Sequence, residues 1–415
     1  MKKDYNIEII TTGEELLSGT TLDTNFFSLA EKVFSLGLKV NYHQCVGDQK
    51  EDILSALKIA NSRSKFVVVT GGLGPTNDDL TRAVASEYFQ KELIFDKKEE
   101  DKIKKIFTKR KRKYTSLNKK QAFFPQGSSI IHNHLGTASG FSISNDSTKF
   151  YFLPGVPQEF KSMITNTFLK DLSKTQKKHK LYSYSKTLKI FGLTESEVAK
   201  KIDKISTKKT YIGFRPYNFE IHLRLISKSN KLAEAKKYNL ATEKKVRKSL
   251  GDLIFTDKDI TLAENVVHLV LKKKIKIAVA ESCSGGLLSS MITDVPGSSK
   301  CFEFGLVTYS NKSKEENLNV KNKTLIDYGA VSKNVVLEMA NNIKSKSKAD
   351  ISIAISGIAG PGGGTKEKPV GTVFIGLSSI NGTNVVKYSL SGNRKSIKLR
   401  TCLIALDTIR KELIN

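Results

Sequence analysis

The sequence predicts an α/β protein in which a doubly wound N-terminal region and an α/β C-terminal region flank a small α+β region. Short continuous apolar runs alternate with helical patterns toward both ends of the chain, and glycines follow directly after several of these runs. Continuous apolar runs are typical of parallel strands that are buried on both faces. A chain of 415 residues is also too long to fold around a single hydrophobic core. We therefore expect three domains, at 1–171, 172–255 and 256–415.

The N-terminal domain contains two buried-type strands that end at glycines. The run YNIEIITT (5–12) stops at Gly13, and FVVVT (66–70) stops at Gly71 and Gly72. Between them the apolar spacing predicts helices at 25–36 and 52–62 and an extended stretch at 38–45. Strands that alternate with helices favour a parallel, doubly wound sheet.

The end of this domain carries two further patterns. Residues 96–120 are dense in charge and include KRKRK at 109–113, which we interpret as a solvated helix rather than as a basic binding patch. FLPGVPQEF (152–160) has the proline and glycine spacing of a rigid loop that enters a helix.

The middle domain has a different pattern. Residues 186–202 are typical of a strand, a turn and a helix, with Thr194 as the N-cap and Glu197 completing a capping box. FEIHLRLI (219–226) alternates as a half-buried strand does, and a helical pattern follows. The segment lacks the G-x-x-G loop of RNA-binding KH domains.

The C-terminal domain returns to the α/β pattern. The sequence predicts a helix at 262–271, strands at 275–280 and 350–356, and a further strand that begins at Gly371.

Composition excludes several classes of protein. Hydrophobic residues make up 39% of the chain and charged residues 27%, as in soluble globular proteins. No apolar run approaches the length of a membrane span and no secretory signal opens the sequence, so we expect a cytoplasmic protein without a membrane partner. The four cysteines are scattered, which favours reduced thiols over disulfides or a zinc site.

The net charge of +28 raises the question of nucleic-acid binding. Ten of the 69 basic residues are arginines, and the remaining lysines are spread along the whole chain. Proteins that recognise nucleic-acid bases favour arginine, which can form two hydrogen bonds to one base. We therefore expect the dispersed lysines to form a solvated surface, and we expect no nucleic-acid partner.

Two glycine-rich turns follow buried strands in the C-terminal domain: AESCSGG (280–286) and SGIAGPGGG (356–364). Ligands gather at the carboxyl ends of parallel strands, and glycines let the backbone approach a phosphate or carboxylate. Neither turn has the ending of a Walker A loop. Ordinary tight turns remain the alternative interpretation.

The first turn offers two candidate nucleophiles. No histidine follows His268, so nothing of that kind can activate Cys283, and we expect a packed structural thiol there. Ser282 needs only a nearby base, and a desolvated lysine can serve. The stretch VTYSNKSK (307–314) supplies Tyr309 and Lys314. A Ser/Tyr/Lys group with backbone N–H donors is suited to amide hydrolysis.

The chain resembles the CinA (competence-damage-inducible) family over nearly its whole length. AVAESCSGG, GLVTYSNKSK, SGIAGPGGG, KPVGTV and SGNR match the C-terminal nicotinamide-nucleotide amidohydrolase domain, and GEELLSG, TGGLGPTNDDLT and LPGVPQE match the molybdopterin-binding-like N-terminal domain. The resemblance implies that nicotinamide mononucleotide is hydrolysed to nicotinic acid mononucleotide and ammonia, without a C-terminal cofactor. It also implies small-molecule nucleotide substrates and a homodimer.

The resemblance assigns roles at the C-terminal site. Ser282 would be the nucleophile, activated by Tyr309 and Lys314, and Arg394 would hold the phosphate of the substrate. The nucleotide pocket would be lined by residues of both glycine turns: Ser284, Gly285, Gly286, Ser356, Gly357, Gly360, Gly362 and Gly363.

For the N-terminal domain the resemblance implies an ADP-ribose pyrophosphatase that needs a divalent cation such as Mg²⁺. Asp78 and Asp79 would hold the cation, because carboxylates suit this ion. Asp79 is the stronger candidate, since it aligns with the acidic position of the molybdopterin-binding pattern. The substrate site would comprise Glu15, Asp23, Asn25, Asp48, Gly71, Gly72, Gly74 and Thr76. Roles as caps or turn formers remain open for the first four of these.

Three positions depart from the family pattern. Ser284 stands where threonine is usual, and Asn393 replaces the usual aspartate beside Arg394. Glu14 stands where aspartate or asparagine is usual, which weakens the N-terminal assignment more than the C-terminal one. A non-catalytic molybdopterin- or nucleic-acid-binding protein remains the alternative function.

Overall fold

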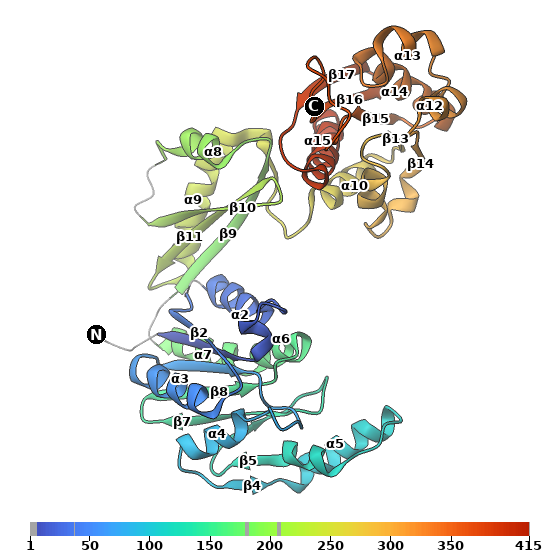
Figure 1. Cartoon of the computed structure of the whole chain (residues 1–415). Coiled ribbons are helices and arrows are strands. Elements are labelled where there is room, and N and C mark those ends of the chain that lie inside the picture. Colours follow the sequence, from blue (N-terminus) through green and yellow to red (C-terminus); the bar gives the residue numbers. More distant parts are fainter. Residues whose placement is uncertain (1–5, 37, 179–181, 206–208, 415) are drawn as a thin grey trace. The chain divides into compact units, whose positions relative to one another are not determined.

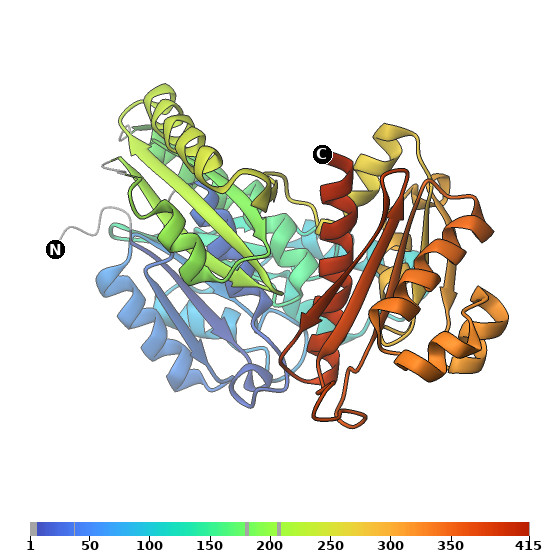
Figure 2. The ribbon, with the colours of Figure 1, turned by 90° about the horizontal axis from the view of Figure 1, so that it is seen from above.

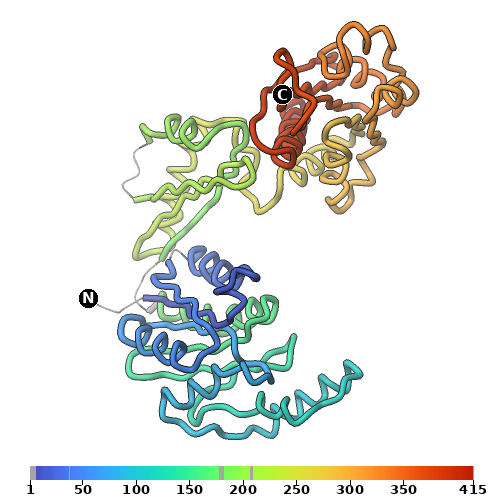
Figure 3. The backbone as a smooth tube through the Cα atoms, viewed as in Figure 1, coloured from blue at the N-terminus to red at the C-terminus, as the bar shows by residue number. Residues whose placement is uncertain are grey.

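The computed structural model describes residues 6–36, 38–178, 182–205 and 209–414. The chain forms two compact units, drawn as a ribbon in Figure 1 and as a tube in Figure 3. The first comprises residues 1–185, 208–211 and 226–241, and the second comprises 186–207, 212–225 and 242–415. This division distributes the expected middle domain over both units, so the boundaries at 171/172 and 255/256 stay predictions.

The first unit is built on a six-stranded sheet in the order β2-β1-β3-β8-β7-β6. Its strands are β1 (Ile7–Thr12), β2 (Tyr42–Val46), β3 (Phe66–Thr70), β6 (Ser129–Ile131), β7 (Gly140–Asn145) and β8 (Thr148–Leu153). The first four in this order are parallel, and the apolar residues of β1, β3 and β8 are buried. β7 is antiparallel because only Asp146 and Ser147 link it to β8, and so short a connection can join only antiparallel neighbours.

Helices cover both faces of this sheet, as the doubly wound prediction requires. One apolar layer lies under α3 and α4, and the other lies under α2, α6 and α7. The helices of the unit are α1 (Glu14–Leu17), α2 (Thr24–Ser35), α3 (Lys50–Arg63), α4 (Thr81–Tyr88), α5 (Lys97–Lys109), α6 (Pro157–Asn166) and α7 (Phe168–Lys178). The small strands β4 (Leu93–Phe95) and β5 (Phe123–Pro125) pair separately.

The sequence-based elements agree with these bounds to within a few residues. The predicted extended stretch at 38–45 contracts to β2, which begins at Tyr42. Residue 5 of the predicted first strand lies outside the described residues. The charged segment at 96–120 contains α5, a helix on which Glu100 pairs with Lys97 and Lys104. Figure 3 shows α5 extending away from the sheet of its own unit.

The middle of the chain forms a four-stranded sheet in the order β10-β11-β9-β12. Its elements are β9 (Tyr182–Phe191), α8 (Glu195–Ile202), β10 (Thr210–Tyr217), β11 (Glu220–Ser229), α9 (Leu232–Leu250) and β12 (Ile254–Thr256). The capping box predicted at Thr194 and Glu197 is present, with the Glu197 carboxylate accepting the Thr194 backbone N–H at 2.7 Å.

The C-terminal part of the second unit is a five-stranded sheet in the order β14-β13-β15-β16-β17. Its strands are β13 (Ile277–Glu281), β14 (Phe302–Val307), β15 (Ile351–Gly357), β16 (Thr372–Ser379) and β17 (Gly382–Ser389). The first three in this order are parallel, and β16 and β17 are antiparallel.

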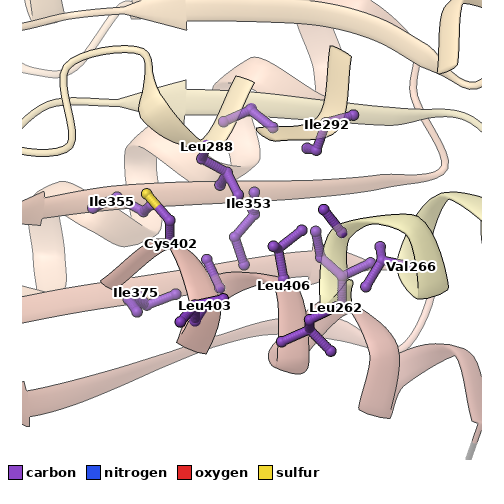
Figure 4. Close-up of a cluster of buried hydrophobic side chains, with 14 of the residues drawn as sticks. Leu262, Val266, Leu288, Ile292, Ile353, Ile355, Ile375, Cys402, Leu403 and Leu406 are labelled. Atoms are coloured by element: carbon purple, nitrogen blue, oxygen red, sulfur yellow. The ribbon is translucent and has the colours of Figure 1, made fainter. Parts of the chain in front are cut away.

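Helices cover both faces of this sheet as well (Figures 1 and 2). They are α10 (Leu262–Lys273), α11 (Leu287–Thr293), α12 (Asn311–Leu318), α13 (Asn322–Tyr328), α14 (Lys333–Ser347) and α15 (Arg394–Ile414). Figure 4 shows the core between the sheet and α10, α11 and α15, where Ile353, Leu406 and Val266 meet. This packing fixes the end of β13 against α15. Among the described residues, no helix has the length and apolarity needed to cross a membrane.

Candidate active site

Ser282 lies directly after the buried strand β13, on a turn that only glycines can complete easily. The backbone N–H of Gly285 donates to the carbonyl of Ser282 at 3.0 Å. Gly285 and Gly286 have φ values of +63° and +88°, a left-handed conformation that L side chains rarely adopt. The turn leads into α11 and presents Ser282 at the end of the strand.

Glu281 anchors this turn, and sequence reasoning missed its role. Its carboxylate is fully buried and accepts the N–H groups of Leu288 and Ser289, at 3.1 and 2.8 Å, and the Ser289 hydroxyl at 2.7 Å. A carboxylate at the first turn of a helix is stabilised by the unpaired N–H groups there. The acidic residue that closes the apolar run was the available signal.

Lys314 comes from α12, whose N-cap is Ser310, and its side chain is directed inward with 1% exposure. Its Nζ lies 3.1 Å from Ser282 Oγ. The same nitrogen is 2.8 Å from the carbonyl oxygen of Thr308 and 3.4 Å from that of Tyr309. Ser282 and Lys314, which the sequence could only propose as partners, are therefore in hydrogen-bond contact.

The surroundings of Lys314 favour a neutral amine. Burial lowers the pKa of Lys314. No carboxylate forms an ion pair with it in the part of the chain that the structure describes. Two of its three contacts are carbonyl oxygens, which can only accept. In the structure Nζ donates to Ser282 Oγ and to both carbonyls. In its neutral form the amine keeps two N–H groups and gains one lone pair, which can accept the hydroxyl proton of Ser282.

Tyr309 is placed differently from Lys314. Its ring is 58% exposed, and its hydroxyl accepts a hydrogen bond from Arg394 Nη2 at 2.8 Å. The other terminal nitrogen of Arg394 donates to the carbonyl of Gly360 at 2.6 Å. Tyr309 thus contacts the Ser282–Lys314 pair through its backbone carbonyl, and the activating role of its hydroxyl stays a prediction.

Asn393, the departure beside Arg394, caps the start of α15. Its Oδ1 accepts the N–H of Ser396 at 2.9 Å. Asparagine and aspartate serve equally at such a position, so the replacement preserves the local structure that directs Arg394.

The second glycine turn contains residues with different environments. The Ser356 hydroxyl donates to the carbonyl of Ala330 at 2.7 Å. A Cβ at Gly357 or Gly360 would come within 2.8 Å of Val373 Cγ2 or 2.6 Å of Val370 Cγ1, so these glycines permit close packing. A Cβ at Gly362 would meet nothing within 4 Å. The predicted binding roles of these residues and of Gly363 stay predictions.

The two residues that follow Ser282 are buried. Cys283 is 5% exposed in the apolar core, and burial raises the pKa of its thiol to about 11. The prediction of a packed structural thiol is confirmed. Ser284 is fully buried, and among the described residues its hydroxyl has no hydrogen-bond partner.

The N-terminal candidates also come together. A cavity of about 610 Å³ lies at the carboxyl ends of β1 and β3. All ten predicted residues line it: Glu15, Asp23, Asn25, Asp48, Gly71, Gly72, Gly74, Thr76, Asp78 and Asp79. The doubly wound sheet explains this, because its strand ends and loops converge at one edge.

Asp79 organises the glycine loop of this cavity. Its two oxygens accept the N–H groups of Gly74 and Thr76, both at 2.8 Å, and the Thr76 hydroxyl at 2.6 Å. The N–H of Gly71 donates to the carbonyl of Leu153. The backbone N–H groups of Gly71, Gly74 and Thr76 therefore have protein acceptors. The substrate-binding role of these three residues stays a prediction.

Two other predicted residues have structural partners. Asp23 caps α2 through the N–H of Phe26 at 2.8 Å and pairs with His43 at 3.1 Å. Asn25 is buried, and its Nδ2 donates to Thr70 Oγ1 and to the carbonyl of Gly155. Structural roles, which the sequence left open, are present at both positions.

Carboxylates crowd the opposite side of the cavity. The N–H of Glu14 donates to Asp48, and the N–H of Asp48 donates to Glu14. Burial raises the pKa of Asp48, and repulsion from Glu15, Glu14 and Asp79 adds to the rise. A divalent cation would relieve this repulsion.

The donor set suits a cation held partly by its substrate. Within the described residues, no group of three or more His, Cys, Asp and Glu side chains is arranged to hold a metal ion. Mg²⁺ commonly uses one or two carboxylates together with substrate phosphates and water. Asp78 is exposed and Asp79 is half-buried at the cavity, so this pair fits that mode.

Comparisons with known proteins identify the family. The model of the CinA C-terminal domain matches residues 259–413, the probable molybdopterin binding domain matches 8–174, and the damage-inducible protein CinA KH domain matches 185–256. A relative from Caldicellulosiruptor saccharolyticus, named as a competence-damage inducible protein, is 40% identical over 98% of this chain and 99% of its own length. The chain belongs to the CinA family.

Other CinA proteins are similar. A CinA-like protein of Kosmotoga olearia is 39% identical over 98% of both chains. A crystal structure of a CinA protein from Thermoplasma acidophilum is 32% identical and covers 41% of this chain and 99% of its own, with a TM-score of 0.37. The CinA assignment includes the middle segment, which matches the KH model of this family although it lacks the G-x-x-G loop.

Proposed function

We propose that the chain hydrolyses the carboxamide of nicotinamide mononucleotide to nicotinic acid mononucleotide and ammonia, with Ser282 as the nucleophile and Lys314 as the general base. The observation that carries the proposal is the 3.1 Å contact between Lys314 Nζ and Ser282 Oγ. The choice of substrate rests on the resemblance of the surrounding motifs to nicotinamide-nucleotide amidohydrolases.

The first half of the reaction acylates the serine. Lys314 accepts the hydroxyl proton as Ser282 Oγ forms a bond to the carboxamide carbon. The carbonyls of Thr308 and Tyr309 stabilise the ammonium that results. Lys314 then gives this proton to the amide nitrogen, the C–N bond breaks, and ammonia leaves.

The second half releases the acid. Water adds to the acyl ester while Lys314 accepts one of its protons. The ester bond breaks, and the proton returns to Ser282 Oγ. Nicotinic acid mononucleotide leaves, and serine and lysine recover their starting states.

The test is ammonia release from nicotinamide mononucleotide by purified wild type, Ser282→Ala and Ser290→Ala. Ser290 is an exposed serine on α11 and serves as a matched control. We expect Ser282→Ala to lose at least about a thousandfold in kcat, since a nucleophile is removed, and Ser290→Ala to match wild type. Equal rates for wild type and Ser282→Ala would reject the mechanism.

We also propose an ADP-ribose pyrophosphatase activity in the N-terminal cavity. This proposal is supported by the convergence of all ten predicted residues on one cavity and by the crowding of its carboxylates. When bound, a divalent cation would neutralise the charge of the diphosphate. Asp78 and Asp79 would hold the cation, while Glu15 and Asp48 would border the substrate.

The second activity is tested by ADP-ribose cleavage with Mg²⁺ and with a chelator, in wild type and Asp78→Asn. Asp78 is the better variant because Asp79 also holds the loop, through Gly74 and Thr76. We expect cleavage to stop with the chelator and to fall in Asp78→Asn. Cleavage that survives both treatments would reject the metal assignment.

A further inference from the structure

A second lysine, Lys398, borders the turn that carries Ser282. It lies on α15 four residues after Arg394, so the two side chains share a face of the helix. Its Nζ is 3.3 Å from the position that a Cβ on Gly285 would occupy. At the Cys283 thiol, burial raises the pKa, and the nearby positive charge of Lys398 opposes that rise. The ammonium of Lys398 therefore faces the nucleophile turn.

Lys398 has no carboxylate to neutralise it. It is half-buried, and across the described ranges no ion pair or hydrogen bond involves its side chain. Holding a cation in a partly desolvated place without a counter-charge is costly. An anionic ligand at the turn would offset this cost.

Arg394, which the resemblance assigns to the phosphate, is already engaged. Its two terminal nitrogens donate to the Tyr309 hydroxyl and to the Gly360 carbonyl, at 2.8 and 2.6 Å. These bonds tie the start of α15 to the two loops beside the site. Of the two cations on this face, Lys398 is the one that is free to receive an anion.

We propose that Lys398 binds the 5′-phosphate of the mononucleotide and sets the preference for a mononucleotide over a nucleoside. The inference rests on the proposed amidase function and adds a residue to it. The hydrogen bond from Gly285 N–H to the Ser282 carbonyl closes a turn, so their Cα atoms lie within about 7 Å of each other. Lys398 is thus displaced from the nucleophile along the turn. In the substrate, a pyridine ring and a ribose likewise separate the carboxamide from the phosphate.

Gly285 is part of this arrangement. A side chain there would meet the ammonium at 3.3 Å, and its φ of +63° disfavours other residues. The bare backbone lets the ammonium of Lys398 lie close to the turn.

The experiment compares ammonia release from nicotinamide mononucleotide and from nicotinamide riboside, which lacks the phosphate. Wild type, Lys398→Gln, Lys398→Arg and Lys395→Gln are assayed as full chains. Lys395 is exposed on the same helix and serves as the matched control. The readout is the ratio of kcat/KM for the mononucleotide to kcat/KM for the riboside.

We expect Lys398→Gln to lower this ratio by about ten- to a hundredfold, the effect of one hydrogen bond to a charged group. The loss should appear mainly in KM, because ground state and transition state share the phosphate contact. Lys398→Arg should restore most of the ratio, and Lys395→Gln should leave it unchanged.

A wild type that is active on the mononucleotide while Lys398→Gln keeps the wild-type ratio would overturn this inference alone. A fall in activity on both substrates by the same factor would also overturn it, since that pattern indicates only support of the turn. A wild type inactive on both substrates would reject the proposed amidase function, and the inference would fall with it.

Discussion

The two units place their candidate sites at equivalent ends of parallel strands but surround them with different titratable groups. After β13, a single buried amine, Lys314, faces a hydroxyl. After β1 and β3, several carboxylates share one cavity, and the pKa of Asp48 is raised. Burial lowers the pKa of the amine and raises that of the carboxyl, because in both cases it disfavours the charged form.

This difference in titratable groups indicates which chemistry each site can support. A lowered pKa favours the neutral amine, the form of lysine that can take a proton from serine. Crowded carboxylates instead create a negative field that a cation and its phosphate ligand can share. We therefore propose proton transfer at the strand ends of one unit and ion-assisted binding at those of the other.

The largest expected effect comes from Lys314→Met, which keeps the volume of the side chain and removes the base. We expect kcat for amide hydrolysis to fall by about a thousandfold, within the range for loss of a general base. Lys312→Met is the control, because Lys312 is exposed on the same helix and pairs only with Glu316. Steady-state kinetics with matched circular dichroism spectra would check this. An active Lys314→Met enzyme would remove lysine from the mechanism.

The pH dependence of activity and of stability tests the effect of burial on Lys314. Because the neutral amine is the active form, kcat/KM should rise with pH through the lowered pKa of Lys314. Between that pKa and the ordinary lysine value, the unfolded chain binds more protons than the folded chain. The free energy of unfolding should therefore rise with pH in this window, and the rise should shrink in Lys314→Met. Denaturant titrations at several pH values measure it, and identical slopes in the two proteins would contradict the burial argument.

The Cys283→Ala variant tests whether the thiol beside Ser282 has a structural or a catalytic role. The thiol is buried and its pKa is raised to about 11, so the wild-type cysteine should react slowly with iodoacetamide. The substitution should cost about 1–2 kcal/mol of stability, as loss of a buried atom does, and leave the amidase rate nearly unchanged. Loss of the rate in a folded Cys283→Ala protein would point to the thiol as the nucleophile.

The smallest expected effect is at Asp48. Since its folded pKa is raised, Asp48 favours the folded state at low pH, and this contribution is lost as pH rises through the folded pKa. Asp48→Asn keeps an oxygen for the N–H of Glu14 and removes the repulsion. We expect a gain below about 1 kcal/mol at neutral pH, because solvent screens this partly exposed group. Thermal melts without divalent cations would show it, and a lower melting temperature would refute the repulsion argument.

Local patterns carried most of the fold prediction. The strand at 66–70 matches β3 residue for residue, and the capping box at Thr194 is present. Apolar runs and caps depend on neighbours in the chain, so a sequence displays them directly. The antiparallel strands of both large sheets were not predicted, because pairing direction depends on which distant strands meet.

The sequence by itself determined that a serine and two glycine turns follow buried strands and that a lysine follows a further apolar stretch. It also showed acidic and glycine-rich segments in the N-terminal half. Only the tertiary structure decided which of these groups touch. Ser282 and Lys314 are 32 residues apart in the chain and meet because β13 and α12 pack in one core. The same packing engaged Arg394 with Tyr309 and left Lys398 free. Contacts of this kind depend on the burial of whole elements, and no short stretch of sequence encodes them.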